Sequence, residues 1–198
     1  MAETDDTGGL RERKRKETLQ RITDAGLKLF GRDGYEKTTV DEIAAEAGIS
    51  RRTFFHYFAS KDEILLSMQA GLGDSLVDAM QAIGGNLSPL AVMREAMLTL
   101  ASAFEPEEMR RIDKIMLSSE SVQTRKQAGY LRDEAKLFAA LKERWPEEPP
   151  FQLRLVAMLS IGVTRMSLEA WREEGGERPV VDVTREIFDS LAALQARR

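Results

Sequence analysis

Cysteine is absent from this 198-residue sequence, and histidine occurs only once, as His56. Without cysteine the chain has no disulfide, no thiolate metal site and no cysteine nucleophile, as is usual in a reducing compartment. No spacing typical of a Ser-His-Asp triad, a metal site or a phosphate-binding loop occurs. We therefore expect no catalytic residue, no metal and no cofactor.

Long apolar runs are also missing. No stretch approaches the roughly 20 apolar residues that a membrane-spanning helix needs. The first nine residues, MAETDDTGG, are acidic, unlike the basic and then apolar start of a signal peptide. With 42% hydrophobic and 31% charged residues, the composition is that of an ordinary globular protein. We expect a cytoplasmic protein that does not associate with a membrane.

Acidic residues outnumber basic residues overall, 33 against 29, but one region has an excess of basic residues. The net charge is −4, yet residues 10–61 contain 12 Lys and Arg against 8 Asp and Glu. Residues 62–198 contain 17 against 22, and the first nine residues add three further acidic groups. A basic N-terminal part joined to an acidic body is the charge distribution expected of a DNA-reading domain on a larger protein.

The region from Thr39 to Phe58 has the signals of two short helices joined by a tight turn. Thr39 and Glu42 have the spacing of a capping box, in which each side chain accepts a hydrogen bond from the other residue's backbone amide. Apolar residues at positions 40, 43, 44 and 47 share one helix face, and Gly48 follows where a helix end favours a left-handed residue. Ser50 can cap the second helix. This spacing predicts a helix-turn-helix.

The second helix, residues 51–58, has two different faces. Phe54 and Phe58 are four residues apart and are expected to face the core. Four side chains then point outward, namely Arg51, Arg52, Phe55 and His56. Arginine can bridge O6 and N7 of guanine in the major groove, while other groups contact phosphates or a thymine methyl. The alternative is an ordinary helical hairpin with a solvated basic face.

A further helix is expected directly after this motif. Ser60 and Glu63 have the spacing of a second capping box, which places Lys61 in the first helical turn. A cation at the positive end of an exposed helix costs roughly 0.3–1 kcal/mol. A bound phosphate would offset that cost, so we expect Lys61 to contact the DNA backbone.

One contiguous run carries a series of motifs, G-Y, T-T-V, I-A-x-x-A-G-I-S, T-x-x-x-Y-F and S-K-D-E-x-L, within LKLFGRDGYEKTTVDEIAAEAGISRRTFFHYFASKDEILL. In these motifs the chain resembles the N-terminal DNA-binding domain of the TetR family of bacterial transcriptional regulators. The resemblance covers residues 14–70, about a third of the chain. It implies an all-helical protein with a helix-turn-helix domain, a ligand-binding domain and a homodimeric assembly.

The resemblance also implies a set of DNA-binding residues in and beside the helix-turn-helix, residues 39–58. They are Thr39, Ser50, Arg51, Arg52, Thr53, Phe55, His56, Tyr57 and Lys61. Positions matching Thr39, Tyr57 and Lys61 usually hold the DNA backbone in the family. The family most often has tyrosine where this chain has Phe55, and that hydroxyl commonly contacts a phosphate. Phe55 is therefore expected to act through apolar contact alone.

The whole chain reads as an all-α protein of about nine helices. We expect a disordered tail over residues 1–9, a helix-turn-helix DNA-binding domain over 10–60 and a ligand-binding and dimerisation domain over 61–198. Residues 11–16, RERKRK, fit a solvated helix face and a phosphate-binding extension equally well. The helices of the larger domain are expected over 61–83, 88–104, 106–117, 121–145, 151–171 and 181–195.

The last two of these helices are apolar over more than one face, which predicts burial on two sides. In the family they form a four-helix bundle with their copies in a second subunit, and the apolar excess independently favours a homodimer. The candidate interface residues are Leu155, Leu159, Gly162, Met166, Ile187, Leu191 and Leu194. The alternative is that both helices belong to the core of a monomer.

Eight of the nine methionines lie between Met68 and Met166. Methionine fills irregular core gaps, which is its commoner role, but it also suits a deformable cavity for an apolar effector. The candidate pocket residues are Met93, Met97, Met116, Phe138, Met158, Ile161 and Arg165. Because Arg165 lies in the most apolar helix, we expect it to be buried, paired either with a carboxylate such as Glu169 or with an acidic head group.

These observations favour a DNA-binding regulator, most simply a repressor that holds a near-palindromic double-stranded operator as a homodimer and releases it when a small effector binds. A fatty acid or an acyl-CoA is the candidate effector, because family members with a similar RTFFxYF recognition helix are associated with acyl-CoA thioesters. A regulator that responds to another protein is the alternative. An α-helical enzyme using His56 with nearby carboxylates is a further one, although His56 lies on an exposed basic face.

Overall fold

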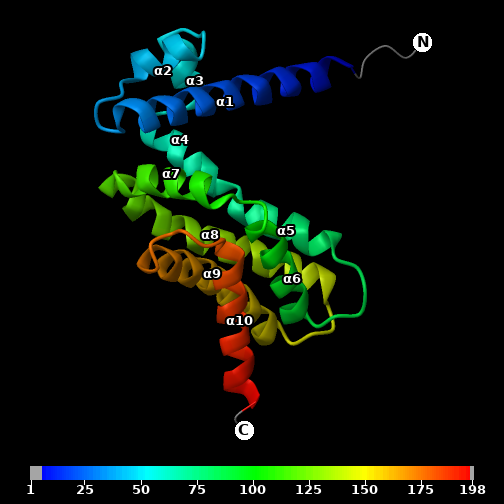
Figure 1. Ribbon diagram of the computed structural model, residues 1–198. Helices are drawn as coiled ribbons and strands as arrows, with labels where there is room; N and C mark the ends of the chain where they lie inside the picture. Colours follow the sequence, from blue (N-terminus) through cyan, green and yellow to red (C-terminus); the bar gives the residue numbers. More distant parts are fainter. Residues whose placement is uncertain (1–5, 197–198) are drawn as a thin grey trace, which may run out of the picture. The chain divides into compact units, whose positions relative to one another are not determined.

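The computed structural model describes residues 6–196, which form an all-α protein with no strand in that range (Figure 1), as the sequence predicts. Ten helices follow one another along these residues. They are α1 (Asp6–Asp33), α2 (Val40–Glu46), α3 (Arg51–Tyr57), α4 (Lys61–Ala70), α5 (Leu72–Ala82), α6 (Pro89–Ala101), α7 (Pro106–Leu117), α8 (Glu120–Arg144), α9 (Pro150–Glu173) and α10 (Val180–Ala196). Within the same residues, no helix combines the length and the apolar character needed to cross a membrane.

The helix expected over residues 61–83 is two helices, α4 and α5, separated at Gly71. A glycine inside a helix costs roughly 1 kcal/mol relative to alanine, and this segment has Gly71 and Gly73 two residues apart. Gly73 is also needed for close packing, because a Cβ atom there would lie 2.7 Å from Oδ1 of Asp133 on α8. The interruption raises the number of helices from about nine to ten.

The start of the chain also differs from the expectation of a disordered tail over residues 1–9. Helix α1 already begins at Asp6, so residues 6–9 are helical. Residues 1–5 lie outside the described part of the chain. The basic run 11–16 therefore lies on α1, with exposed side chains and an ion pair of 2.9 Å between Arg13 and Glu17 one turn on.

The chain packs as two compact units. Unit 1 comprises the residues up to Ser67 together with residues 112–123, and unit 2 comprises residues 68–111 and the residues from Thr124 onward. This division differs from the expected boundary between residues 60 and 61. It gives unit 1 the start of α4 and the turn that joins α7 to α8.

Unit 1 is built around the three N-terminal helices, with α2 packed against both α1 and α3 (Figure 1). Its buried core draws on every element of the unit. The core residues are Ile22, Ala25, Leu29, Phe30, Tyr35, Ile43, Ala44, Ala47, Phe54, Phe58, Ile64, Leu65, Ile115, Met116 and Val122. The last three come from residues 112–123, so a segment from the middle of the chain completes the core of unit 1.

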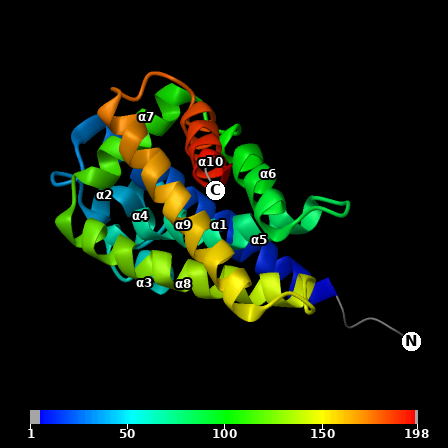
Figure 2. The same cartoon turned by 90° about the horizontal axis from the view of Figure 1, so that it is seen from below.

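Unit 2 is a helical bundle in which α9 packs against α6 and α10, and α5 packs against α6 (Figure 2). Its main core is formed by Leu76, Met80, Val92, Met93, Met97, Tyr130, Leu137, Leu141, Leu153, Ala157, Ile161, Val163 and Phe188. Each fully buried large apolar side chain stabilises the fold by roughly 1.5–3 kcal/mol. Trp171 anchors a smaller cluster, and its indole N–H donates to the carbonyl of Arg178 at 2.8 Å.

Candidate functional site

Helix α2 begins with the capping box that the sequence predicts. The Thr39 amide donates to Oε2 of Glu42 at 2.8 Å, and the Glu42 amide donates to Oγ1 of Thr39 at 3.3 Å. The backbone hydrogen bond from Thr39 lowers the pKa of the Glu42 carboxyl. Two amides at the helix start are thereby satisfied, which fixes where α2 begins.

The turn between α2 and α3 also follows the sequence signals. Gly48 has a φ of +65°, the left-handed conformation that glycine adopts without strain. The Ile49 amide then bonds back to the carbonyl of Ala44 at 2.9 Å, and Ile49 packs on the core of unit 1. Ser50 caps α3 by accepting the Thr53 amide at 3.0 Å. The path of the chain into α3 is therefore closely defined.

Helix α3 has the two faces that its sequence predicts. Phe54 and Phe58 are buried in the core of unit 1, with their ring centroids 5.9 Å apart. Arg51, Arg52 and His56 are exposed, and Phe55 keeps 46% of its surface accessible. A rigid helix thus presents cations, an imidazole and an apolar ring to the solvent on one side.

Arg51 is already engaged within unit 1. Its guanidinium pairs with Oδ2 of Asp41 on α2 at 2.6 Å and lies 5.5 Å from the centroid of the Phe55 ring. An exposed ion pair of this kind contributes only about 0–1 kcal/mol to stability. Its geometric effect is more relevant, because it orients both Arg51 and the ring of Phe55.

Arg52 and His56 lie one helical turn apart on the exposed face. Arg52 has no hydrogen-bond or ion-pair partner within residues 6–196, and the ring of His56 meets the ring of Tyr57 edge-on at 5.3 Å. A guanidinium that is not committed to the protein can donate two of its N–H groups to guanine O6 and N7. Arg52 is therefore an exposed cation of α3 that no group of the described residues engages.

The other predicted DNA-binding side chains are hydroxyls that take part in capping. Thr39 donates its hydroxyl to Glu42 at 2.8 Å, and the hydroxyls of Ser50 and Thr53 share a hydrogen bond of 2.8 Å. Tyr57 is half-buried and packs against the core of unit 1. These residues hold the ends of α2 and α3 in place and lie beside the exposed face.

Lys61 has a geometry that differs from the expected phosphate contact. Its ammonium donates to the carbonyl oxygens of Tyr35, Glu36 and Thr38 at 2.7, 3.2 and 3.2 Å. It also lies 4.3 Å from the centroid of the Tyr35 ring. All three ammonium protons have acceptors, so Lys61 fastens the loop between α1 and α2 to the start of α4. These three carbonyls offset the electrostatic cost of a cation at a helix start. The sequence predicts that a DNA phosphate provides this compensation.

This geometry agrees with the comparisons with known proteins. Residues 22–68 match the sequence model of the bacterial regulatory proteins of the tetR family. The matched segment contains the whole helix-turn-helix, both of its capping residues and Lys61.

Residues 22–68 form a DNA-binding domain of the TetR family.

Curated relatives extend the similarity beyond this domain. The regulator TcmR of Streptomyces glaucescens is 32% identical over 105 residues, which are 53% of this chain and 46% of TcmR. MftR of Mycobacterium tuberculosis, named for the regulation of mycofactocin biosynthesis, is 28% identical over 163 residues, which are 80% of this chain and 82% of MftR. The chain thus spans less than half of the first relative and most of the second.

Solved structures of the TetR family share the fold. FadR of Thermus thermophilus, a transcriptional repressor crystallised with lauroyl-CoA, has a TM-score of 0.58 at 22% identity. The match covers 88% of this chain and 93% of that one. At this identity the likeness establishes the fold of this chain and nothing about its ligand.

A contact that no sequence motif predicts lies at the start of α4. Asp62 accepts hydrogen bonds from the hydroxyls of Tyr35 and Ser121. Tyr35 is buried, and its burial together with the hydrogen bond to Asp62 raises the pKa of the phenol. The phenol is therefore a neutral donor near neutral pH. Asp62 thereby joins the loop after α1 to the first turn of α8 inside unit 1.

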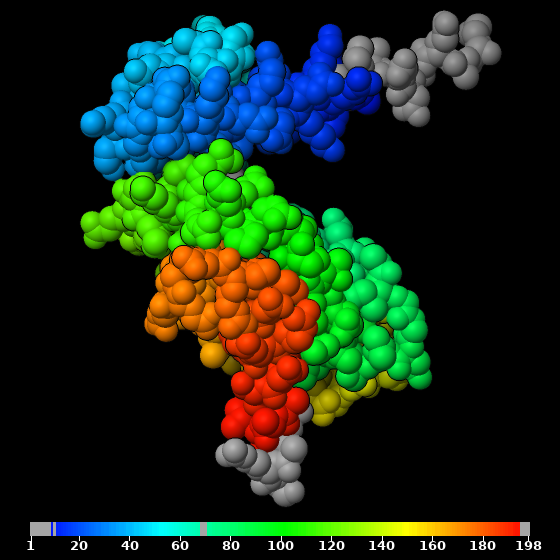
Figure 3. All heavy atoms as spheres, in the orientation of Figure 1, coloured from blue at the N-terminus to red at the C-terminus, as the bar shows by residue number. Residues whose placement is uncertain are grey.

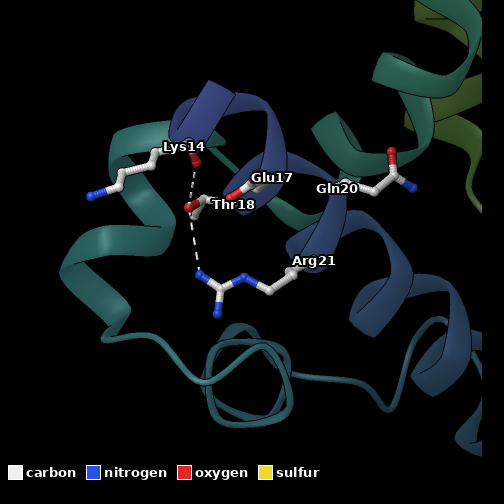
Figure 4. A pocket seen from close by; sticks show the side chains of 5 residues that line it. All are labelled: Lys14, Glu17, Thr18, Gln20 and Arg21. Atoms are coloured by element: carbon white, nitrogen blue, oxygen red, sulfur yellow. Dashed lines mark hydrogen bonds between the residues drawn. The ribbon is translucent and has the colours of Figure 1, made fainter. Parts of the chain in front are cut away.

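Helix α1 carries further cations of this TetR-family domain. Figure 4 shows an open hollow along one side of α1, lined by Lys14, Glu17, Thr18, Gln20 and Arg21. Arg21 donates to the hydroxyl of Thr18 at 3.5 Å, and that hydroxyl donates to the carbonyl of Lys14 at 2.9 Å. Both cations remain exposed.

The predicted ligand-pocket residues lie in different environments. Met93, Met97, Phe138 and Ile161 belong to the core cluster of unit 2. The assignment of Met116 is wrong, because Met116 packs in the core of unit 1. Met158 and Arg165 are also misplaced, because both are exposed, Met158 with 50% of its surface accessible.

The expectation that Arg165 is buried is therefore wrong. Its guanidinium lies 6.0 Å from the ring centroid of Tyr130 and otherwise faces solvent. Helix α9 is apolar nearly all round, so sequence periodicity gave no basis for deciding which of its faces is covered. Arg165 falls beside Met166 on the face that unit 2 leaves open.

The predicted dimer residues divide into two groups. The first group follows helical spacing along α9 and consists of Leu155, Leu159, Gly162 and Met166. Leu155 and Met166 are exposed. A Cβ atom built on Gly162 would meet no other part of the protein within 4 Å. Figure 3 shows α9 and α10 at the surface of unit 2. The second group differs, since Ile187 and Leu191 pack on the core of unit 2 and only Leu194 at the end of α10 is exposed.

Proposed function

We propose that this protein is a DNA-binding transcriptional regulator of the TetR family with α3 as its recognition helix. The observation that carries the proposal is the exposed face of α3, where Arg52, Phe55 and His56 are held on a helix whose start, end and buried side are all fixed. A preorganised face of this kind loses little conformational entropy when it enters a major groove. The ring of Phe55 suits a thymine methyl, and Arg52 suits guanine.

We further propose that the protein acts as a homodimer on a near-palindromic operator. An apolar stripe of Leu155, Met158 and Met166 on a helix surface is the feature expected of a subunit interface. Gly162 lies in the same stripe with open space around it, so a second helix can approach its backbone. Two recognition helices separated by roughly 34–36 Å would enter successive major grooves.

We also propose that the protein is a cytoplasmic repressor, and that a small effector bound in unit 2 relieves the repression. A coupling of roughly 1–3 kcal/mol between two sites changes DNA affinity about 5- to 150-fold. The suggestion of a fatty acid or acyl-CoA rests on the similar recognition helix and on the lauroyl-CoA bound to the Thermus thermophilus relative. The exposed position of Arg165 removes the residue that was to hold the acidic head group.

The remaining alternatives have less support. A regulator that responds to a protein would use the same α3 but no interior ligand, so a screen of small molecules by thermal shift separates it from the effector-responsive form. An enzyme would need His56 in a sheltered site, whereas His56 is exposed on α3 beside Tyr57. The exposure of His56 argues against the enzyme.

Selection from random duplex DNA tests the proposal directly. The wild-type protein should enrich a sequence made of two inverted half-sites whose centres are about one helical turn, or a multiple of it, apart. Its affinity for the enriched duplex should exceed that for a scrambled duplex by at least about 10³-fold at physiological salt. Enrichment of no sequence, with equal binding to both duplexes, would contradict the proposed function.

A further inference from the structure

A carboxylate interrupts the apolar face of α8 that covers the core of unit 2. Tyr130, Asp133 and Leu137 follow one another at spacings of three and four residues, so they share one helix face. Tyr130 and Leu137 belong to the apolar core of unit 2, and Asp133 keeps only 6% of its surface accessible. An aspartate at such a position needs an explanation, because charged groups are rarely buried without a partner.

One oxygen of this carboxylate has a partner within the protein. The Gly73 amide, at the start of α5, donates to Asp133, and a Cβ on Gly73 would lie 2.7 Å from Oδ1. The residue before α5, Gly71, provides no side-chain cap. Oδ1 of Asp133 thus satisfies an amide at the positive end of α5.

The other oxygen is unsatisfied. Oδ2 of Asp133 is buried and has no hydrogen-bond partner among the described residues. The ammonium of Lys136, which acts electrostatically on Asp133, is held by Oδ1 of Asp74 at 2.6 Å. Arg132 is exposed and acts on Asp133 only at a distance. Neither Lys136 nor Arg132 therefore donates a hydrogen bond to Oδ2 of Asp133.

A buried acceptor without a donor costs roughly 1–3 kcal/mol, and more when it is charged. Burial accordingly raises the pKa of the Asp133 carboxyl, because it disfavours the charged form. A protonated amine would satisfy Oδ2 and neutralise the charge at once. Such a charge-assisted hydrogen bond is about twice as strong as one between neutral groups.

The surroundings of Asp133 suit a ligand with an apolar body. Tyr130 and Leu137, which flank Asp133 on its helix face, belong to a core cluster that also contains Leu76 and the buried Met80, Met93 and Met97. Methionine side chains adjust to irregular shapes at little cost. A flexible apolar chain can therefore displace them more easily than it could displace branched residues.

We propose that Asp133 is the head-group site of the effector, and that it binds the protonated amine of an organic cation whose apolar part lies among the methionines of unit 2. This inference rests on the proposed effector response and specifies its ligand class. It differs from an acyl-CoA or a fatty acid, whose head group is an anion.

Titration calorimetry with three ten-carbon probes, each below its micellar concentration, tests the site. Decylammonium should bind the wild-type protein at least about ten times more tightly than decan-1-ol, and decanoate should bind most weakly. Asp133→Asn, which keeps an oxygen for the Gly73 amide, should lose at least about tenfold in decylammonium affinity and leave decan-1-ol unchanged. Asp78→Asn, which removes an exposed carboxylate from the same helix α5, is the matched control and should bind all three probes like the wild type.

Equal decylammonium affinity in wild type and Asp133→Asn would overturn the site, as would tighter binding of decanoate. If Asp133→Asn does not fold, the comparison of the three probes on the wild type still decides, because an uncharged alcohol that binds as well as the amine also overturns it. DNA binding is measured separately without probe. Its failure would contradict the proposed function, whereas intact DNA binding with no decylammonium binding would contradict the Asp133 site alone.

Discussion

Ser121 donates its hydroxyl to the carboxylate of Asp62, a residue 59 positions earlier in the chain. Asp62 accepts the phenol of Tyr35 as well, so one carboxylate in the first turn of α4 connects two other segments of unit 1. Ile115, Met116 and Val122 bury apolar surface in the same unit around this contact. The turn between α7 and α8 is therefore a structural part of the DNA-binding unit.

Removing the Ser121 hydroxyl should weaken this connection. We expect Ser121→Ala to lower the free energy of unfolding by about 0.5–1.5 kcal/mol, the usual value of one hydrogen bond. Ser190→Ala, whose hydroxyl only bonds back to the carbonyl of Glu186 in its own helix, is the control and should change stability much less. Urea denaturation measures both. A double-mutant cycle with Tyr35→Phe that shows no coupling would contradict the shared role of Asp62.

A second prediction concerns Lys61, for which the sequence predicts a phosphate contact and the structure shows hydrogen bonds to backbone carbonyls. Because its ammonium is bound by three carbonyls, Lys61→Met should lower the free energy of unfolding by about 1.5–3 kcal/mol. The dependence of operator affinity on salt concentration should keep its slope. A phosphate contact would instead make that slope shallower by about one unit while leaving stability unchanged, and this result would restore the original assignment.

The two glycines at the start of α5 should respond oppositely to alanine. At Gly73 a Cβ would lie 3.2 Å from the backbone Cα of Asp133, so Gly73→Ala should lower the free energy of unfolding by about 1–3 kcal/mol. At Gly71 nothing lies within 4 Å and φ is −83°, so Gly71→Ala should stabilise by about 0.4–1 kcal/mol. Thermal unfolding in which both changes act alike would contradict the close approach of α5 and α8.

The pH dependence of stability should report on Asp133. Its pKa is raised by burial, although Arg132 and Lys136 oppose this and Asp74 adds to it. A raised carboxyl pKa means that the folded state binds more protons, so its contribution is present at low pH and is lost as the pH rises through the folded pKa. Above the ordinary aspartate value of about 3.9, wild type should therefore lose stability relative to Asp133→Asn. Urea denaturation at a series of pH values that gives a constant difference would contradict this.

The exposed stripe of α9 leads to a prediction about assembly. Met166→Arg places a charge at a position with 55% of its surface accessible, so the isolated subunit should fold normally. If the stripe forms the subunit interface, the buried charge should convert dimers to monomers in sedimentation. Arg185→Glu, on an exposed position of α10, controls for a general change of charge. An unchanged dimer would remove the stripe from the interface.

Local features of the fold were predictable because neighbouring residues determine them. The capping box of Thr39, the left-handed Gly48 and the inward rings of Phe54 and Phe58 all follow from spacings of a few residues. The break at Gly71 has a local signal in Gly71 and Gly73, although the continuous apolar pattern on either side favours a single helix.

Features that depend on distant residues were not predictable in this way. The partners of Lys61 are backbone carbonyls of another segment, which no side-chain pattern identifies. Met116 packs in unit 1 and Arg165 faces solvent because of the way in which their whole helices, α7 and α9, are oriented. Helix α9 is apolar nearly all round, so its periodicity does not specify which face is buried. The unsatisfied oxygen of Asp133 becomes visible only when its neighbours are placed.

The central claim, that α3 reads DNA through Arg52, is tested most directly by the affinity ratio between the selected operator and a scrambled duplex. Arg52→Ala should lower this ratio about 5- to 150-fold and relax the preference at one base position in each half-site, as expected for the loss of 1–3 kcal/mol of base discrimination. Arg185→Ala should leave the ratio unchanged. Equal losses of affinity on both duplexes, with the ratio intact, would contradict base reading by Arg52.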